Sequence, residues 1–188
     1  MSRERHLCPW WVGYLLASPL RKLFQDPRRI LAPYVREGMT TVDFGCAMGF
    51  FSLPLARMVG RQGRVVCVDC QPFMLDRLMR RARRARLEGA IEARLAENGD
   101  FGLAADLERF DFALAIAVVH EVSDQTGLFR ALHASLRPGA MLVVGEPTGH
   151  VTGDAFDAEL RAAREAGLSL VDRPQFRRTH AALLQKVA

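Results

Sequence analysis

The stretch that most constrains the fold is Thr41-Val-Asp-Phe-Gly-Cys-Ala-Met-Gly-Phe50. Its first residues form an apolar run typical of a buried strand, and two glycines, Gly45 and Gly49, follow directly. Glycine at such positions lets the backbone turn tightly and approach a ligand without a Cβ atom in the way. The stretch therefore predicts a strand followed by a ligand-contacting turn, the arrangement found at binding sites of open α/β sheets.

Short apolar runs alternate with helical patterns along the rest of the chain, which predicts a parallel sheet with crossover helices. The connection between the last two strands is too short for a helical crossover, so these strands are expected to be antiparallel. The predicted fold class is α/β: a Rossmann-like three-layer sandwich with a mostly parallel seven-stranded sheet and a C-terminal antiparallel hairpin. The expected strands are 40–44, 64–69, 91–95, 110–119, 140–146, 168–172 and 179–187, and the expected helices are 51–59, 72–87, 125–136 and 153–166.

The composition is that of a globular protein, with 188 residues, 49% of them hydrophobic and 25% charged. The formal net charge is +5, but only Lys22 and Lys186 are lysines, so arginine dominates and a bias in base composition explains the charge as well as an anionic partner does. Cys67 and Cys70 have C-x-x-C spacing without the second pair that a zinc site needs. We therefore expect no metal site, and the free thiols suit a reducing cytoplasm.

Residues 1–37 are expected to form a helical and aromatic segment, with the main domain at 38–188. Trp10, Trp11 and Tyr14 in this segment are expected to form a lid over the substrate. Covering an exposed part of the core and weak contact with a membrane surface are the alternatives. Prolines interrupt the apolar stretch 7–20, which is too short to span a bilayer, so neither a transmembrane segment nor a signal peptide is expected.

An acidic residue, Asp69, ends the second expected strand about 20 residues after the glycine turn. A carboxylate at this place can accept two hydrogen bonds from the vicinal hydroxyls of a ribose. Capping of the helix that begins near Pro72 is the competing role. Together with the glycine turn, Asp69 favours a nucleoside ligand.

Four stretches resemble, in order and spacing, motifs of the class I S-adenosylmethionine-dependent methyltransferases. They are Val-Asp-Phe-Gly-Cys-Ala-Met-Gly at 42–49, Gly-Arg-Val-Val-Cys-Val-Asp at 63–69, Phe-Asp-Phe-Ala-Leu-Ala at 110–115 and Leu-Arg-Pro-Gly-Ala-Met-Leu-Val-Val at 136–144. The resemblance covers residues 38–188. It implies S-adenosylmethionine as cofactor and methyl transfer to a small-molecule acceptor by in-line displacement, and leaves the acceptor and the oligomeric state open.

The resemblance also implies roles for individual residues. Asp43 would meet the amino-acid end of the cofactor, Asp69 the ribose, and Met74 the adenine face, while Glu97 would bind the adenine amino group. Ala117, at the end of the fourth strand, would lie beneath the sulfonium. The full cofactor-binding set is Asp43, Gly45, Ala47, Gly49, Asp69, Cys70, Met74, Glu97, Asn98 and Ala117.

Ala47 departs from the family pattern, which has a glycine at this position. We expect Ala47 to adopt an ordinary conformation with negative φ, which would leave the turn undisturbed. If the position requires positive φ, the methyl group strains the turn. The alternative function is then a cofactor-binding protein with weak or lost catalysis.

The candidate catalytic residues are His120, Glu146 and Tyr14. His120 is expected to shape the pocket wall rather than to act as a general base, and Glu146 either binds a cationic substrate group or caps the next turn. An arginine-rich run at 77–86 raises the alternative of an RNA methyltransferase. The fourth-strand motif lacks the Asn-Pro-Pro-Tyr type of sequence that base-methylating enzymes use, so nucleic acid is disfavoured as a partner.

Overall fold

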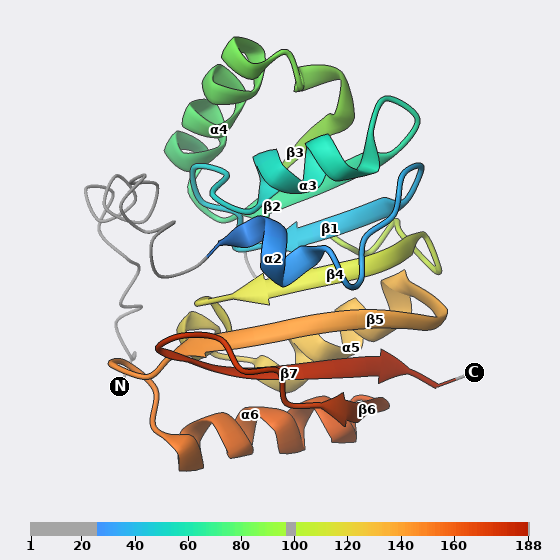
Figure 1. Ribbon diagram of the computed structural model, residues 1–188. Helices are drawn as coiled ribbons and strands as arrows, with labels where there is room; N and C mark the ends of the chain where they lie inside the picture. The colour runs from blue at the N-terminus through green and yellow to red at the C-terminus, as the bar shows by residue number, and fades with distance from the viewer. Residues whose placement is uncertain (1–25, 97–100, 188) are drawn as a thin grey trace.

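The computed structural model describes residues 26–96 and 101–187, which form a seven-stranded sheet in the order β3-β2-β1-β4-β5-β7-β6 (Figure 1). The strands β1 to β5 pair in parallel, and β7 lies antiparallel between β5 and β6. The predicted mixed sheet with its antiparallel hairpin is therefore confirmed. The strands are β1 (Thr40–Phe44), β2 (Arg64–Asp69), β3 (Ile91–Leu95), β4 (Phe110–Ile116), β5 (Leu136–Pro147), β6 (Leu168–Asp172) and β7 (Thr179–Lys186).

Helices cover both faces of the sheet and complete the predicted three layers. Buried side chains of α2, α3 and α4 share one core cluster with the sheet, and those of α5 and α6 share the other. The strands alternate accordingly, so that Val65 points into the first cluster and Val66 into the second. The helices are α2 (Pro27–Leu31), α3 (Ser52–Val59), α4 (Pro72–Ala85), α5 (Gln125–Ser135) and α6 (Gly153–Glu165), with short 3-10 turns η2 (Glu88–Ala90) and η3 (Val119–Glu121).

Two strand boundaries differ from those expected by more than one residue, both for reasons of backbone geometry. The strand β4 ends at Ile116 because Ala117 takes a φ of +59° and turns the chain into η3. The strand β5 begins at Leu136, four residues earlier than expected, because Leu136 already pairs with Phe110. The register shifts before the next pair, so Arg137-Pro-Gly139, which lies between the expected helix 125–136 and the expected strand 140–146, forms an irregularity within β5.

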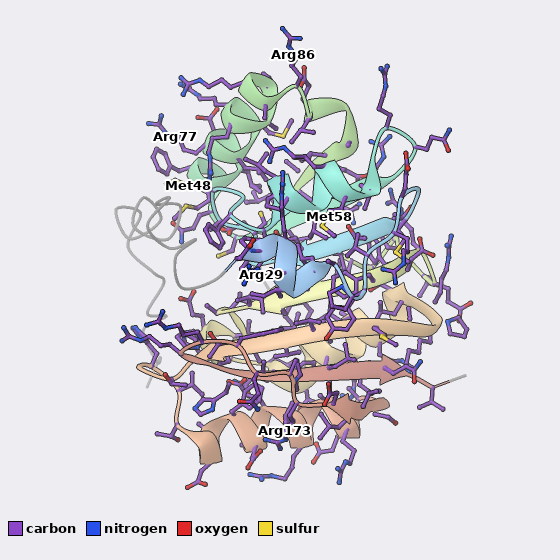
Figure 2. The ribbon with its side chains drawn as sticks, in the orientation of Figure 1. Arg29, Met48, Met58, Arg77, Arg86 and Arg173 are labelled. Carbon is purple, nitrogen blue, oxygen red and sulfur yellow. The ribbon has the colours of Figure 1, made fainter. Side chains whose placement is uncertain are left out.

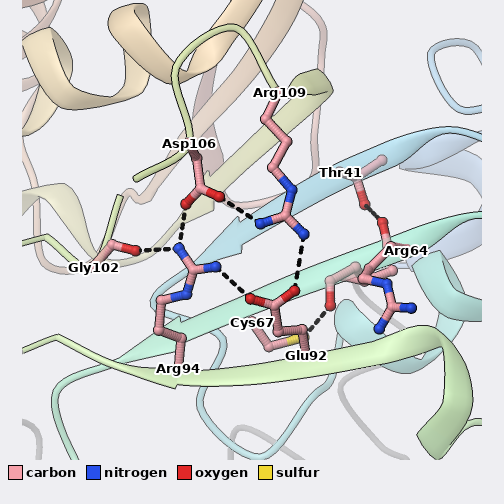
Figure 3. A network of polar contacts seen from close by, with 9 residues as sticks. Thr41, Arg64, Cys67, Glu92, Arg94, Gly102, Asp106 and Arg109 are labelled. Atoms are coloured by element: carbon pink, nitrogen blue, oxygen red, sulfur yellow. Dashed lines mark hydrogen bonds and ion pairs between the residues drawn. The ribbon is translucent and has the colours of Figure 1, made fainter. Parts of the chain in front are cut away.

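The described residues between β3 and β4, 101–109, form no helix, and ion pairs hold them in place instead (Figure 3). Asp106, which is almost fully buried, pairs with both Arg94 and Arg109. Glu92 closes the ring by pairing with the same two arginines. This four-membered network fixes the segment across the β3 edge of the sheet.

The described part of the N-terminal segment packs into the main core. Ile30 and Leu31 of α2 are buried, and the ring of Tyr34 stacks on Phe112 with centroids 6.0 Å apart. Trp10, Trp11 and Tyr14 lie outside the described residues, so the lid stays a prediction. Within residues 26–96 and 101–187, no helix is long and apolar enough to cross a membrane.

Candidate active site

The glycine turn after β1 is shaped by two positions at which a side chain has no room. Gly45 has a φ of +73°, and a Cβ atom there would lie 2.5 Å from Cγ2 of Val118. Gly49 has a φ of +81°, and a Cβ atom there would collide with Leu78 of α4. The turn therefore needs glycine at both places for its backbone conformation and for close packing against Val118, which follows β4, and against α4.

Ala47 takes a φ of +45°, so the expectation of an ordinary negative φ is wrong. The hydrogen bonds of the turn account for this conformation. The N–H of Ala47 donates to Oδ2 of Asp69 at 2.9 Å, while the N–H groups of Gly45 and Cys46 both donate to the carbonyl of Val68. The turn is thereby fixed to the end of β2, and Ala47 bears a strain of about 1–2 kcal/mol.

Asp69 links the glycine turn to the helix that follows β2. Its Oδ2 accepts from Ala47, and its Oδ1 accepts from the N–H of Gln71 at 2.9 Å, directly before α4. Burial raises the pKa of Asp69, and these backbone hydrogen bonds partly offset the rise. Because each carboxylate oxygen has two lone pairs, Asp69 still has acceptor sites for ribose hydroxyls.

The helix α4 holds the turn from the other side. The guanidinium of Arg81 donates to the carbonyl of Met48, and burial lowers the pKa of Arg81. Figure 2 shows Met48 at the end of the sheet next to α4, and Arg77 and Arg86 pointing outward from that helix. Sequence reasoning missed Arg81, because it lies in the arginine-rich run considered for RNA binding. Of the predicted cofactor contacts nearby, Met74 is buried and Cys70 is exposed.

Asp43 is buried at the end of β1, beneath the turn. Its Oδ2 accepts from the hydroxyl of Ser52, the first residue of α3, at 2.5 Å. Asp43 precedes the glycine turn and Ser52 follows it, so this hydrogen bond connects β1 to α3 across the turn. Sequence reasoning did not single out Ser52, although a serine at a helix start is a common hydrogen-bond donor or cap.

His120 and Glu146 form a pair at the carboxyl ends of β4 and β5. Nδ1 of His120 lies 2.5 Å from Oε2 of Glu146, whose side chain is fully buried. The other oxygen, Oε1, accepts from the N–H of Val119 at 2.8 Å. The hydrogen bond that His120 donates to Glu146 raises the pKa of His120, against the opposing effect of burial. Glu146 thus bonds to the turn after β4, rather than to the turn after its own strand.

Several predicted site residues share one edge of the sheet, where β1, β2, β4 and β5 end (Figure 1). Ala117 belongs to this edge, and its N–H donates to the carbonyl of Gly145 at 2.7 Å. Tyr14, Glu97 and Asn98 lie outside the described residues. Residues 26–96 and 101–187 contain no group of side chains that could hold a metal ion.

Comparison with known proteins identifies the family. A model of the methyltransferase domain matches residues 35–175. The chain belongs to the methyltransferase domain family. The chain is 32% identical to the ubiquinone biosynthesis O-methyltransferase of Methylocella silvestris, over 76% of this chain and 54% of the relative. It is 31% identical to the protein of that name from Methylobacterium sp., over 73% of this chain and 58% of the relative.

A solved structure shows that the whole fold is shared. It is a SAM-dependent methyltransferase from Aquifex aeolicus, which superposes with a TM-score of 0.86 and 21% identity, over 96% of this chain and 100% of that one. The methyltransferase fold and the resemblance to the S-adenosylmethionine-dependent class are therefore confirmed. This methyltransferase chain spans only about half the length of these curated relatives.

Proposed function

We propose that this methyltransferase transfers the methyl group of S-adenosylmethionine to a hydroxyl oxygen of a small organic acceptor, with His120 as general base. The observation that carries the proposal is the 2.5 Å contact between His120 and the buried carboxylate of Glu146 at the cofactor edge of the sheet. Such a pair holds an imidazole in one orientation and one tautomer.

The residues at this edge fit the cofactor. Gly45, Ala47 and Gly49 form a tight turn with positive φ at the end of β1, the position at which open α/β sheets bind their ligands. Asp69 retains acceptor capacity for the ribose hydroxyls. Bound S-adenosylmethionine supplies an activated methyl group on a good leaving group, so the protein's own residues have to align the acceptor and exclude water.

A hydroxyl acceptor has to lose its proton as its oxygen attacks the methyl carbon. With Glu146 accepting from Nδ1–H of His120, the second ring nitrogen, Nε2, carries the lone pair that can take this proton. Glu146 then stabilises the imidazolium that forms. This geometry favours a general base over the pocket-wall role that the sequence favoured for His120.

The relatives support oxygen as the attacked atom. Both are named for O-methylation in ubiquinone biosynthesis, so hydroxylated quinone precursors are the first acceptors to test. Two arginines of α4 already have partners within the chain, Arg80 with Asp76 at 2.9 Å and Arg81 with Met48. Both observations favour a small molecule over RNA.

The free thiols of Cys46 and Cys67 suit the cytoplasm, which we include in the proposal.

Calorimetry with S-adenosylmethionine and its demethylated product, followed by methyl transfer to hydroxylated aromatic acceptors, tests the proposal. We expect both ligands to bind, and His120→Asn to lower kcat about 100-fold or more while cofactor affinity is retained. His133→Asn, on α5, serves as the matched control. Absence of binding at millimolar ligand, or full activity of His120→Asn, would contradict the proposal.

A cofactor-binding protein with weak catalysis is the second candidate, because Ala47 stands where the family pattern has a glycine. The same calorimetry separates the two functions. Binding of S-adenosylmethionine without transfer to any hydroxylated acceptor would support the second candidate.

A further inference from the structure

A buried carboxyl group, Glu159, lies behind the His120–Glu146 pair and has no place in the mechanism above. Glu159 is only 3% exposed, and its Oε2 atom has no hydrogen-bond partner. It belongs to α6, whose buried residues Phe156 and Ala163 lie one turn to either side and face the sheet. An acidic residue in this apolar stripe is costly unless its charge is removed or used.

The strands bring the pair and Glu159 to the same face of the sheet. Glu146 on β5 is directly opposite His180 on β7, so the two side chains point to one face. The ring of His180 stacks on Phe156 with centroids 5.7 Å apart, which places this end of α6 over Glu146. The charges of Glu146 and His120 both act on Glu159.

Two buried carboxyl groups whose charges act on each other do not readily both ionise. Glu146 accepts hydrogen bonds from the N–H of Val119 and from His120. Glu159 has no such donor at Oε2. Burial and then the charge of Glu146 raise the pKa of Glu159 to about 8, against the opposing effect of His120. Glu159 is therefore the neutral acid of the two at pH 7.

We propose that Glu159 is a positioning residue for His120: by holding a proton, it leaves Glu146 as the single anion behind the imidazole. A second anion would stabilise the imidazolium, and a base that is already protonated cannot take the proton of the acceptor. This inference rests on the proposed role of His120 as general base. In this proposal Glu159 controls the protonation state of His120 and does not contact the substrate.

The other groups around Glu159 do not provide an alternative partner among the described residues. From β7, His180 stacks on Phe156, and from η3, Glu121 adds a further negative charge near His120. From α5, the side chains in this core are apolar, Leu128 and Leu132 among them. Glu159 thus keeps its proton because of burial first, and then because of the charge of Glu146, with His120 acting in the opposite direction.

The test is a pH titration of the full chain with isotope-labelled histidine and glutamate, observed by NMR without acceptor. His120 is assigned from the spectrum of His120→Asn. Because Glu159 stays protonated while His120 titrates, the midpoint of His120 in Glu159→Gln, whose amide is also neutral, should lie within about 0.2 pH unit of the wild type, and the signal of a glutamate that titrates near pH 8 should disappear. Glu165→Gln, an exposed position on the same helix, should keep that signal.

A midpoint of His120 that falls by about half a pH unit or more in Glu159→Gln would show that Glu159 is an anion in the wild type, and would overturn the proposal. If Glu159→Gln does not fold, the wild-type carboxyl signals decide: a glutamate that titrates near pH 8 supports the proposal, and its absence overturns it. None of these titrations needs methyl transfer, so they succeed or fail independently of the proposed function. Where transfer is observed, the acidic limb of the kcat profile should stay at the same pH in Glu159→Gln.

Discussion

The carboxylate of Asp69 accepts the backbone N–H of Ala47 at 2.9 Å, and Ala47 has a φ of +45°. The acid that ends β2 thus holds the one alanine of the glycine turn in a left-handed conformation. The strain is present in the fold itself, before any cofactor binds. It therefore lowers the stability of the protein rather than its affinity for the cofactor.

Replacing Ala47 by glycine should stabilise the protein and change cofactor binding little. Relief of the left-handed conformation outweighs the entropy that glycine adds to the unfolded chain, so the free energy of unfolding should rise by about 0.5–1 kcal/mol. Affinity for the demethylated cofactor should stay within about threefold, as measured by calorimetry. Arg178→Gly, at a φ of +56° in another turn, is the control for backbone relief. A tenfold gain in affinity for Ala47→Gly would show that the methyl group itself obstructs the ligand.

Replacing Gly45 by alanine should destabilise the protein by about 2–3 kcal/mol, because the new methyl group meets Val118 and φ is positive. The double variant with Val118→Ala should recover the steric part of this loss and leave the backbone part. Gly89→Ala, where a Cβ atom meets nothing within 4 Å, should be close to neutral. Chemical denaturation measures all three, and equal losses for the single and double variants would contradict the steric explanation.

Asp69→Asn should weaken binding of the demethylated cofactor about 100-fold, since hydrogen bonds to a charged group are worth about 1.5–3 kcal/mol each. The ribose role is separated from the role in the turn by comparing this ligand with its 2′-deoxy form. The wild type should discriminate between the two ligands, and Asp69→Asn should not. Asp76→Asn, on the surface of α4, is the control. If both ligands weaken equally, Asp69 acts only through the turn.

Much of the fold could be predicted because its strands are apolar runs with clear ends. The strands β1, β2, β3 and β6 begin and end where the sequence predicts. The end of β4 and the start of β5 differ from the prediction because both depend on contacts between strands. Ala117 leaves β4 where its N–H donates to Gly145, and Arg137-Pro-Gly139 stays in β5 because Leu136 pairs with Phe110. Neither contact can be read from the local sequence, because each joins residues that are far apart in the chain.

For the candidate site, the sequence could predict which single residues lie at the ends of the strands. Asp43, Asp69, His120 and Glu146 all lie at the edge where the strand pattern places them. The φ of Ala47 could not be predicted, because it follows from a hydrogen bond to a residue 22 positions away. Glu159 could not be predicted as a neighbour of Glu146 either, because the antiparallel strand β7 determines how α6 lies over β5.

Asp106→Asn tests the ion-pair network of Figure 3 through its dependence on pH. Burial alone would raise the pKa of Asp106, but hydrogen bonds from Arg94 and Arg109 outweigh this effect and lower it. Because the pKa of Asp106 is lower in the folded protein than the value of 3.8 in the unfolded chain, its ionised carboxylate stabilises the fold above pH 3.8. This stabilisation is lost as the pH falls through the pKa of the folded state. At pH 7 the variant should be less stable by about 2 kcal/mol, since both arginines are partly exposed. The difference from the wild type should narrow below pH 4, and a constant difference would contradict the ionic role.

Glu159→Gln should change how the stability of the protein depends on pH at the alkaline side. The pKa of Glu159 is raised from 4.5 to about 8, so the stability that its proton provides is fully present below 4.5 and is lost as pH rises through 8. His120, whose pKa is also raised, changes stability in the same direction, but it does so in both proteins.

The free energy of unfolding of the wild type should therefore fall between pH 5 and 9 by about 4 kcal/mol more than that of Glu159→Gln. Urea denaturation at each pH measures the two curves, and Glu165→Gln, which is exposed on the same helix, should follow the wild type. Parallel curves for the wild type and Glu159→Gln would mean that Glu159 is already ionised at pH 5. A neutral acid behind Glu146 would then be excluded, whatever the activity of the enzyme.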